Sequence, residues 1–219
     1  MLRDKIQTEE HFQELFEWRF QCLQEAFDRF EKVKPENLLS HFRFRVIDYE
    51  DLLNIGYSLG KDVQELFPYY KGLLSDLKKI ASEGVPFYRA VDVFALGVLY
   101  SDRKEEFLDD LKDIYAQMDH TDGLIEYYMT YLFHDMVVPF HSILEYQNMI
   151  EDTYESVAKA QGFWYYSHSD APWYNNHIKD TYVGYWSFDT AATCKIKGIY
   201  DERLKELEYF PYDLLLQEK

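Results

Sequence analysis

The residues with the clearest potential for chemistry are the histidines and aspartates in the second half of the chain. Imidazole and carboxylate side chains are common ligands of zinc and iron. The chain has no His-Glu-x-x-His motif and no Glu-x-x-His pair, and Pro139 breaks the helical spacing between the first two of these histidines. A metal-dependent helical enzyme is therefore an alternative, and ordinary hydrogen-bonded side chains are the favoured interpretation. The candidates are His134, Asp135, His141, His168, Asp170 and His177.

Two candidate nucleophiles and one glycine-containing loop lack the motifs that their chemistry requires. Ser187 lies in YWSFD and lacks the G-x-S-x-G pattern of a nucleophile elbow. Cys194 occupies an Ala-rich helical position and is expected to be a small buried residue. GYSLGKD, residues 56–62, is one residue short of a phosphate-binding loop and carries Asp62 where a hydroxyl should hold the metal. We therefore expect no catalytic residue and no cofactor.

The spacing of apolar residues predicts the helices that would position these groups. From Phe12 to Phe30 they recur three and four positions apart, which is typical of an amphipathic helix and here predicts one that ends near Pro35. Asp62 and Asp122 are expected to cap two later helices. No stretch alternates as a strand would, so we predict an all-α, multi-helix, bundle-like globule. Further helices are expected at 36–60, 62–80, 85–100, 103–118, from 122 to before Pro139, and at 140–160 with Gly162 as its end, followed by shorter helices from Phe163 onward.

The stretch AQMDHTDG, residues 116–123, is the best internal boundary, because it combines turn-forming and charged residues. We expect an N-terminal helical region over 1–120 and a C-terminal one over 121–219, sharing one core. The charged N-terminus has no signal-peptide pattern, and no apolar window is long enough to span a membrane. Two cysteines do not make a disulfide framework. These features predict a cytoplasmic protein.

Charge restricts the class of partner. The chain has 40 acidic and 23 basic residues, a formal net charge of −17. Direct binding to nucleic acid or to an anionic membrane surface is disfavoured, since both require cations. An acidic surface favours basic protein partners. The alternatives are that these charges serve solubility alone, or that the chain is a generic acidic scaffold or DNA mimic.

The aromatic stretch TYVGYWSFDTAATCKIKG, residues 181–198, is interpreted as architecture. Gly184 allows a tight turn, and Ser187 or Asp189 could cap the helix that follows. Tyr185 and Trp186 are expected to pack against APWYNNH and YFPYDL. The burial of such rings stabilises a fold by about 1.5–3 kcal/mol each.

At these residues the chain resembles the PoNi immunity proteins. WYNNHIKDTYVGYWSFDTAATCKIKGI followed by YFPYDLL is similar to the C-terminal signature of that family, and LRDKIQTEEHFQELFEW, YYKGLLSDLKKIAS and VLYSDRKEEFLDDL are similar to its N-terminal region. The helix DTAATCKIKGI is more polar than is usual there. The residues interpreted as a structural signature are Trp173, Tyr174, His177, Gly184, Tyr185, Trp186, Phe188, Asp189, Pro211, Tyr212 and Asp213.

The resemblance implies an all-helical, non-enzymatic protein that binds and neutralises a cognate PoNe-type DNase toxin in competition between bacteria, for example after type VI secretion. No catalytic residue follows from it. For the contact surface, we expect the segment 102–126, where nine acidic residues stand against three basic ones. A solvated helix face without a partner is the alternative. The residues expected to bind the toxin are Glu106, Asp109, Asp110, Asp113, Asp119 and Asp122.

Overall fold

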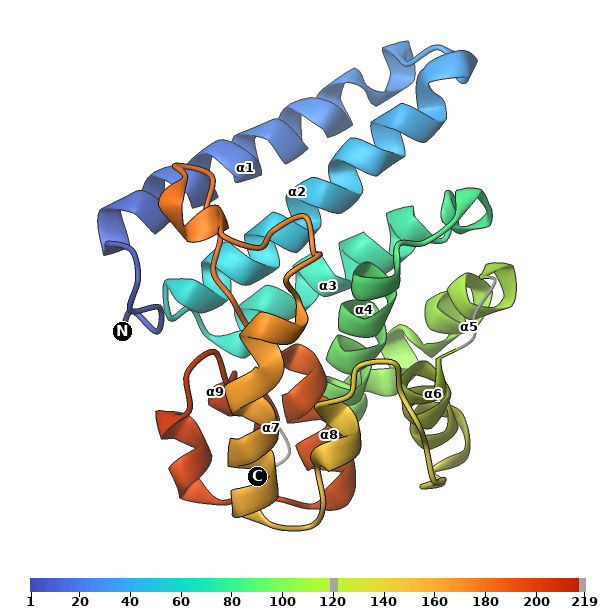
Figure 1. Cartoon of the computed structure of the whole chain (residues 1–219). Coiled ribbons are helices and arrows are strands. Elements are labelled where there is room, and N and C mark those ends of the chain that lie inside the picture. Colours follow the sequence, from blue (N-terminus) through green and yellow to red (C-terminus); the bar gives the residue numbers. More distant parts are fainter. Residues whose placement is uncertain (119–121, 217–219) are drawn as a thin grey trace. The chain divides into compact units, whose positions relative to one another are not determined.

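The computed structural model describes residues 1–118 and 122–216, and these residues form helices and connecting segments without a strand (Figure 1). The all-α prediction is confirmed. The helices are α1 Glu9–Arg29, α2 Leu38–Ser58, α3 Val63–Leu77, α4 Phe87–Leu99, α5 Leu108–Gln117, α6 Gly123–His134, α7 Tyr154–Ser167, α8 Phe188–Lys197 and α9 Tyr212–Leu215.

The chain divides into two compact units, each built from separated stretches. Unit 1 comprises Met1–Gly84, Asp113–Met118 and Asn175–Tyr185. Unit 2 comprises Val85–Lys112, Asp119–Tyr174 and Trp186–Lys219. The proposed division at residue 120 stays a prediction.

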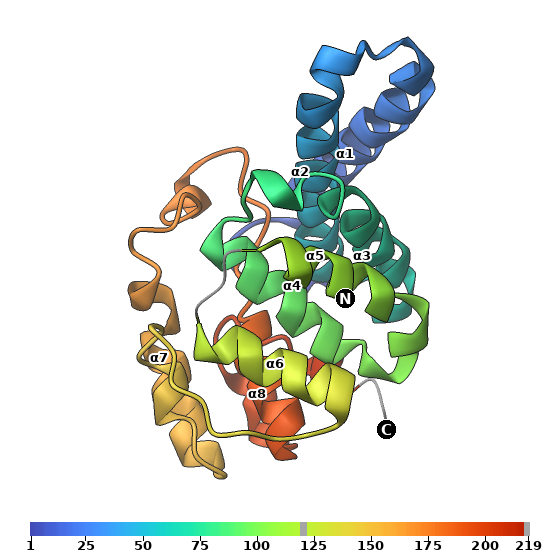
Figure 2. The same ribbon diagram turned by 90° about the vertical axis from the view of Figure 1, so that its right-hand side faces the viewer.

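Unit 1 is a three-helix arrangement in which α2 packs against both α1 and α3. Figures 1 and 2 show α1 and α2 side by side as a long hairpin. The carboxylate of Asp76, which is fully buried, lies 2.8 Å from Nε of Arg45 and 3.0 Å from Nζ of Lys79. The segment 175–185 joins this unit through Tyr182, whose hydroxyl donates to Asp4 at 2.7 Å and whose carbonyl lies 2.8 Å from His11 Nε2.

Unit 2 is organised around α4, which contacts α6 and α8. Residues from Ala90 to Leu99 are buried except Asp92, as expected of a helix that is apolar on all sides. At the end of α4, the buried ammonium of Lys195 donates to the carbonyl oxygen of Leu99 at 2.7 Å. A lysine there satisfies a carbonyl that has no partner within the helix.

Several predicted helix ends are confirmed. The carboxylate of Asp62 accepts from the backbone N–H of Gln64, and that of Asp122 accepts from Leu124, so both act as N-caps. Gly60 and Gly198, at φ +80° and +71°, follow α2 and α8 in the left-handed conformation that glycine adopts most easily.

The predicted helix over 140–160 is wrong. The helix begins only at Tyr154, capped by Thr153, and continues through Gly162 to Ser167. The preceding stretch is held by side chains: Asn148 accepts from the backbone N–H of Ser142 at 2.9 Å and donates to its carbonyl oxygen at 2.7 Å. These bonds satisfy backbone groups that helical hydrogen bonds would otherwise satisfy.

Three smaller expectations also differ from the structure. The helix α1 ends at Arg29 and not near Pro35. The predicted helix 103–118 is a 3₁₀ segment, Ser101–Glu106, followed by α5, and Arg103 inside that segment has a non-helical backbone. Ser187 precedes α8 without capping it, because its hydroxyl bonds Gln161 Oε1 and the Tyr209 carbonyl oxygen, both at 3.0 Å.

Among the described residues, no helix is long and apolar enough to cross a membrane.

Candidate functional site

The acidic segment 102–126 begins in the 3₁₀ segment Ser101–Glu106 and continues along α5. Phe107, Leu111 and Ile114 point inward and are buried. Asp109 and Asp113 lie on the exposed side of α5, and Glu106 is exposed in the preceding turn. This alternation follows from helical periodicity, and it leaves carboxylates in contact with water. Asp110 is half-buried.

Two cations of this segment, Arg103 and Lys112, form ion pairs with nearby carboxylates. Nε of Arg103 lies 2.8 Å from Glu106, and Nζ of Lys112 lies 3.5 Å from Asp109. Such exposed pairs contribute about 0–1 kcal/mol, because water and salt screen them. Lys104 turns away from both and pairs with Asp135 at 2.7 Å. The carboxylates of Glu106 and Asp109 can therefore exchange these pairs for a partner's cations at small cost.

Asp122 has a different environment from the other acidic residues. It is buried, and its carboxylate accepts from Leu124 N–H at 2.8 Å, from Ser142 Oγ at 3.0 Å and from Ile143 N–H at 2.9 Å. These bonds tie the start of α6 to the segment after it. The carboxylate of Asp122 is thus already used in hydrogen bonds within the fold. Asp119 lies outside the described residues.

A buried carboxylate, Asp189 in the first turn of α8, accepts hydrogen bonds from three buried side chains of unit 2. Trp164 Nε1 donates to it at 3.1 Å and Gln147 Nε2 at 2.8 Å, and the hydroxyl of Tyr146 donates as well. Burial first, and then the charge of Asp189, raises the pKa of Tyr146 well above its ordinary value, so this phenol remains a donor. A carboxylate in the first turn also benefits from the helix dipole.

The polar residues of α8 belong to the same network. Thr193 Oγ1 donates to Gln147 Oε1 at 2.9 Å and lies 3.3 Å from the hydroxyl of Tyr128. Tyr128 in turn donates to the carbonyl oxygen of Asp189 at 2.8 Å. The polarity of DTAATCKIKGI therefore has a packing partner: side chains of α6 and of the segment at Gln147.

The remaining signature residues are distributed over both units. In unit 1, the hydroxyl of Tyr185 accepts from the His177 backbone N–H at 3.0 Å, and Gly184 has φ +112°. In unit 2, Trp173 stacks on Trp164 at 5.5 Å and Tyr174 on Tyr165 at 4.6 Å between ring centroids. Trp186, Phe188 and Pro211 are buried, Tyr212 is half-buried and Asp213 is exposed.

The histidines proposed as metal ligands have other surroundings. His168 is buried, with Nδ1 2.7 Å from the Trp164 carbonyl oxygen, and it packs among aromatic rings. His134 and His141 are exposed. Asp170 accepts from the hydroxyl of Tyr88 at 2.5 Å. Within residues 1–118 and 122–216, no three or more His, Cys, Asp or Glu side chains are grouped to hold a metal ion.

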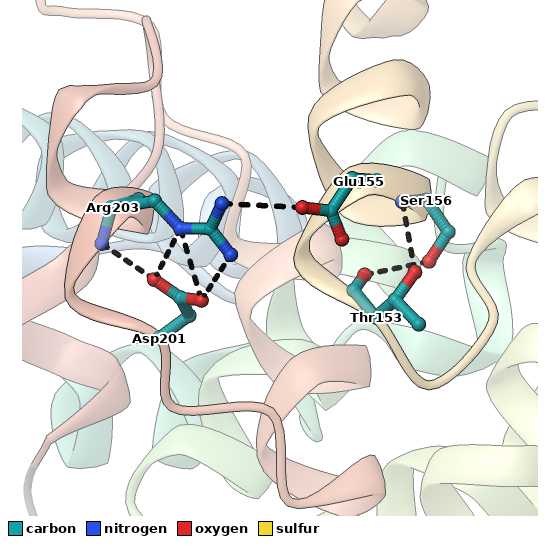
Figure 3. A network of polar contacts seen from close by, with 5 residues as sticks. All are labelled: Thr153, Glu155, Ser156, Asp201 and Arg203. Atoms are coloured by element: carbon teal, nitrogen blue, oxygen red, sulfur yellow. Dashed lines mark hydrogen bonds and ion pairs between the residues drawn. The ribbon is translucent and has the colours of Figure 1, made fainter.

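A polar clamp near the start of α7 was not predicted (Figure 3). The guanidinium of Arg203 bonds both oxygens of Asp201, at 3.0 Å and 2.6 Å, and reaches Glu155 at 3.1 Å. The guanidinium carbon Cζ of Arg203 lies 3.9 Å from the ring centroid of Tyr154. Asp201 is two positions from Arg203, but Glu155 is 48 positions away, so no local spacing indicated the contact with Glu155. The same is true of Tyr146 and Gln147, which bond Asp189.

The described residues define an all-helical protein with an exposed acidic segment and a buried aromatic network. Two family models match this chain: "PoNe immunity protein (PoNi), N-terminal" over residues 3–112, and "PoNe immunity proteins (PoNi), C-terminal" over residues 125–214. The chain belongs to this family of PoNe immunity proteins. No curated protein and no solved structure matches it.

Proposed function

We propose that this chain binds and neutralises a cognate nuclease toxin, a DNase of the PoNe type, and thereby protects its producer in competition between bacteria. The observation that carries the proposal is the match of both family models, which together span most of the chain. The chain acts by occupying the toxin and does not turn over a substrate.

Electrostatics supports this function. A DNase must present cations to the phosphates of its substrate, so its working face is positive. A chain with a net charge of −17 is attracted to such a face, and complementary charge accelerates association. Cognate nuclease–immunity pairs are among the tightest protein complexes known.

The exposed carboxylates of Glu106, Asp109 and Asp113 are the part of the acidic segment that we propose steers the toxin, with Asp110 beside them. Asp122 is left out because its carboxylate is buried and holds the start of α6. The location of the protein in the cytoplasm is part of the same proposal, since a nuclease acts on the chromosome there.

Co-expression tests the proposal. Cells that express the cognate PoNe-type toxin should stop growing, and expression of the chain should restore growth and yield a copurifying complex. A chain with the clamp residue substitution Arg203→Ala serves as a matched variant, because it changes an exposed charge away from the acidic segment and should still protect. Continued growth arrest, with no complex recovered, would contradict the proposal.

A further inference from the structure

The hairpin of α1 and α2 exposes an unusual amount of apolar surface. Seven of the fifteen exposed large apolar side chains among the described residues lie between Trp18 and Ile47. Single exposed apolar residues are normal, whereas a concentration of them marks an interaction surface.

Two of these side chains, Phe44 and Ile47, lie on one side of α2. On α2, Phe44 and Ile47 are three positions apart, and Asp48 and Asp51 follow four positions after each of them, so all four share one side of the helix. The exposed fraction of Phe44 is 68% and that of Ile47 is 37%.

The helix α1 contacts this side of α2 through Arg19. Its guanidinium nitrogens lie 3.0 Å from the carboxylate of Asp48 and 2.5 Å from that of Asp51. The guanidinium carbon Cζ lies 4.4 Å from the ring centroid of Trp18. The indole of Trp18 is 48% exposed. We call these two α2 side chains, Phe44 and Ile47, together with Trp18, Arg19, Asp48 and Asp51, which the contacts of Arg19 link across the two helices, the hairpin patch.

Contacts within the protein already hold the side chains of Trp18 and Arg19 in the hairpin patch. Two carboxylates hold the fork of Arg19, and the stacked indole has few remaining rotamers. Side chains that are already fixed lose little entropy on binding, and Trp is enriched among the residues that carry binding energy.

The charge around the hairpin patch restricts the class of partner that can bind there. The helix α1 carries six acidic and two basic residues. A second copy of this chain would bring the same excess of negative charge, and like charges oppose such a contact. Nucleic acid and anionic lipid are disfavoured for the same reason. A basic protein surface is complementary.

We propose that the hairpin patch is a docking surface for a basic protein surface and, resting on the proposed function, that this surface belongs to the nuclease toxin. The patch supplies desolvated aromatic contacts, which govern how slowly the complex dissociates. The acidic segment 102–126 acts mainly on the rate of association, as exposed charges generally do.

The test compares the double variant Trp18→Ala, Phe44→Ala with the matched control Phe163→Ala, Tyr166→Ala. The control removes two aromatic side chains of α7 that are 51% and 70% exposed. Dissociation from a catalytically inactive variant of the cognate PoNe-type toxin is measured by surface plasmon resonance. The hairpin variant should dissociate at least about tenfold faster, and the control at the rate of the original chain.

A second measurement needs no substitution. Cys22, one turn after Trp18, lies close enough to Arg19 and Asp48 for their charges to act on its thiol. Saturating toxin should therefore slow the reaction of Cys22 with maleimide.

The outcomes separate the two proposals. Unchanged dissociation of the hairpin variant, with normal binding of the original chain, overturns the hairpin patch and leaves the immunity function standing. Failure of the original chain to bind the toxin overturns both. A dimer of the original chain that the hairpin variant converts to monomer in sedimentation overturns the basic occupant in favour of a second copy.

Discussion

Asp189 shows how one carboxylate organises a buried network of polar side chains. Its oxygens accept from a phenol, an amide and an indole, with no cation among these three donors. All three donors are buried, so loss of the acceptor would remove this partner from Tyr146 and Trp164, whereas Gln147 Nε2 keeps Thr190 Oγ1 at 3.5 Å. An unsatisfied buried donor costs about 1–3 kcal/mol.

The substitution Asp189→Asn should therefore destabilise the protein by about 2–4 kcal/mol, because the new amide N–H groups face donors and not acceptors. Urea unfolding followed by circular dichroism measures this change. Asp152→Asn, an exposed carboxylate paired with Lys197 at 3.3 Å, is the control and should stay within about 0.5 kcal/mol. Equal midpoints for the two variants would show that Asp189 does not hold the network.

Cys194 provides a second test at the residue scale. Its thiol is fully buried, and burial first, then the charge of Asp189, raises its pKa. The thiolate is the reactive species, so labelling in the folded protein should be confined to Cys22. Mass spectrometry after maleimide treatment should show modified Cys194 only in denaturant. Rapid modification of Cys194 in the folded protein would mean that α8 opens far more readily than its burial implies.

The clamp of Arg203 connects the segment before α9 to the start of α7. This contact between two elements of the fold is expected to depend on pH. Hydrogen bonds from Arg203, first from its side chain and then from its backbone, lower the pKa of Asp201 below its ordinary value of 3.8. A carboxyl whose folded pKa is lowered contributes stability above its unfolded pKa. That contribution is lost as the pH falls through the folded pKa.

Arg203→Ala should raise the pKa of Asp201 toward 3.8 while the backbone hydrogen bond keeps part of the shift. The pH titration of the Asp201 carboxyl carbon by NMR measures it, with exposed Asp213 as the internal reference. Identical titration curves for Asp201 in both proteins would mean that the clamp does not form in solution.

At the same scale, the sequence predicted the residues that cap the N-termini of two helices. It did not predict the irregular segment 140–153. Asp62 and Asp122 bond the N–H groups that their positions predicted. The segment 140–153 has helix-like apolar spacing, yet Asn148 and Asp122 satisfy its backbone through contacts 6 to 21 positions apart. Such partners depend on the finished fold, so periodicity alone predicted a helix there.

For the whole molecule, the sequence was sufficient to predict the helical fold class and the family resemblance. It was less informative about which residues are exposed to bind a partner. The exposure of Asp109 and Asp113 beside buried neighbours follows the helical period. Periodicity could not reveal that Asp122 is buried by Ser142, nor that Trp18 and Phe44 remain exposed, because apolar residues on an amphipathic helix are expected to face a core.

Charge reversal tests the steering role of the acidic segment. Replacing Glu106, Asp109 and Asp113 together by lysine should slow association with the toxin by about tenfold at low salt, and the difference should shrink at higher ionic strength as charges are screened. The control reverses three exposed carboxylates elsewhere, Glu145, Glu151 and Glu202, which gives the same net charge. Stopped-flow fluorescence measures both. Equal rates for the two variants would remove the segment from the encounter surface.

The central claim is that this helical chain acts by occupying a nuclease. The most direct measurement is cleavage of DNA by a purified cognate PoNe-type toxin, with increasing amounts of the purified chain. The account predicts that cleavage stops when the two proteins are present in equal amounts and that both elute as one complex. Undiminished cleavage at a large excess of the chain, with the two proteins eluting separately, would contradict it.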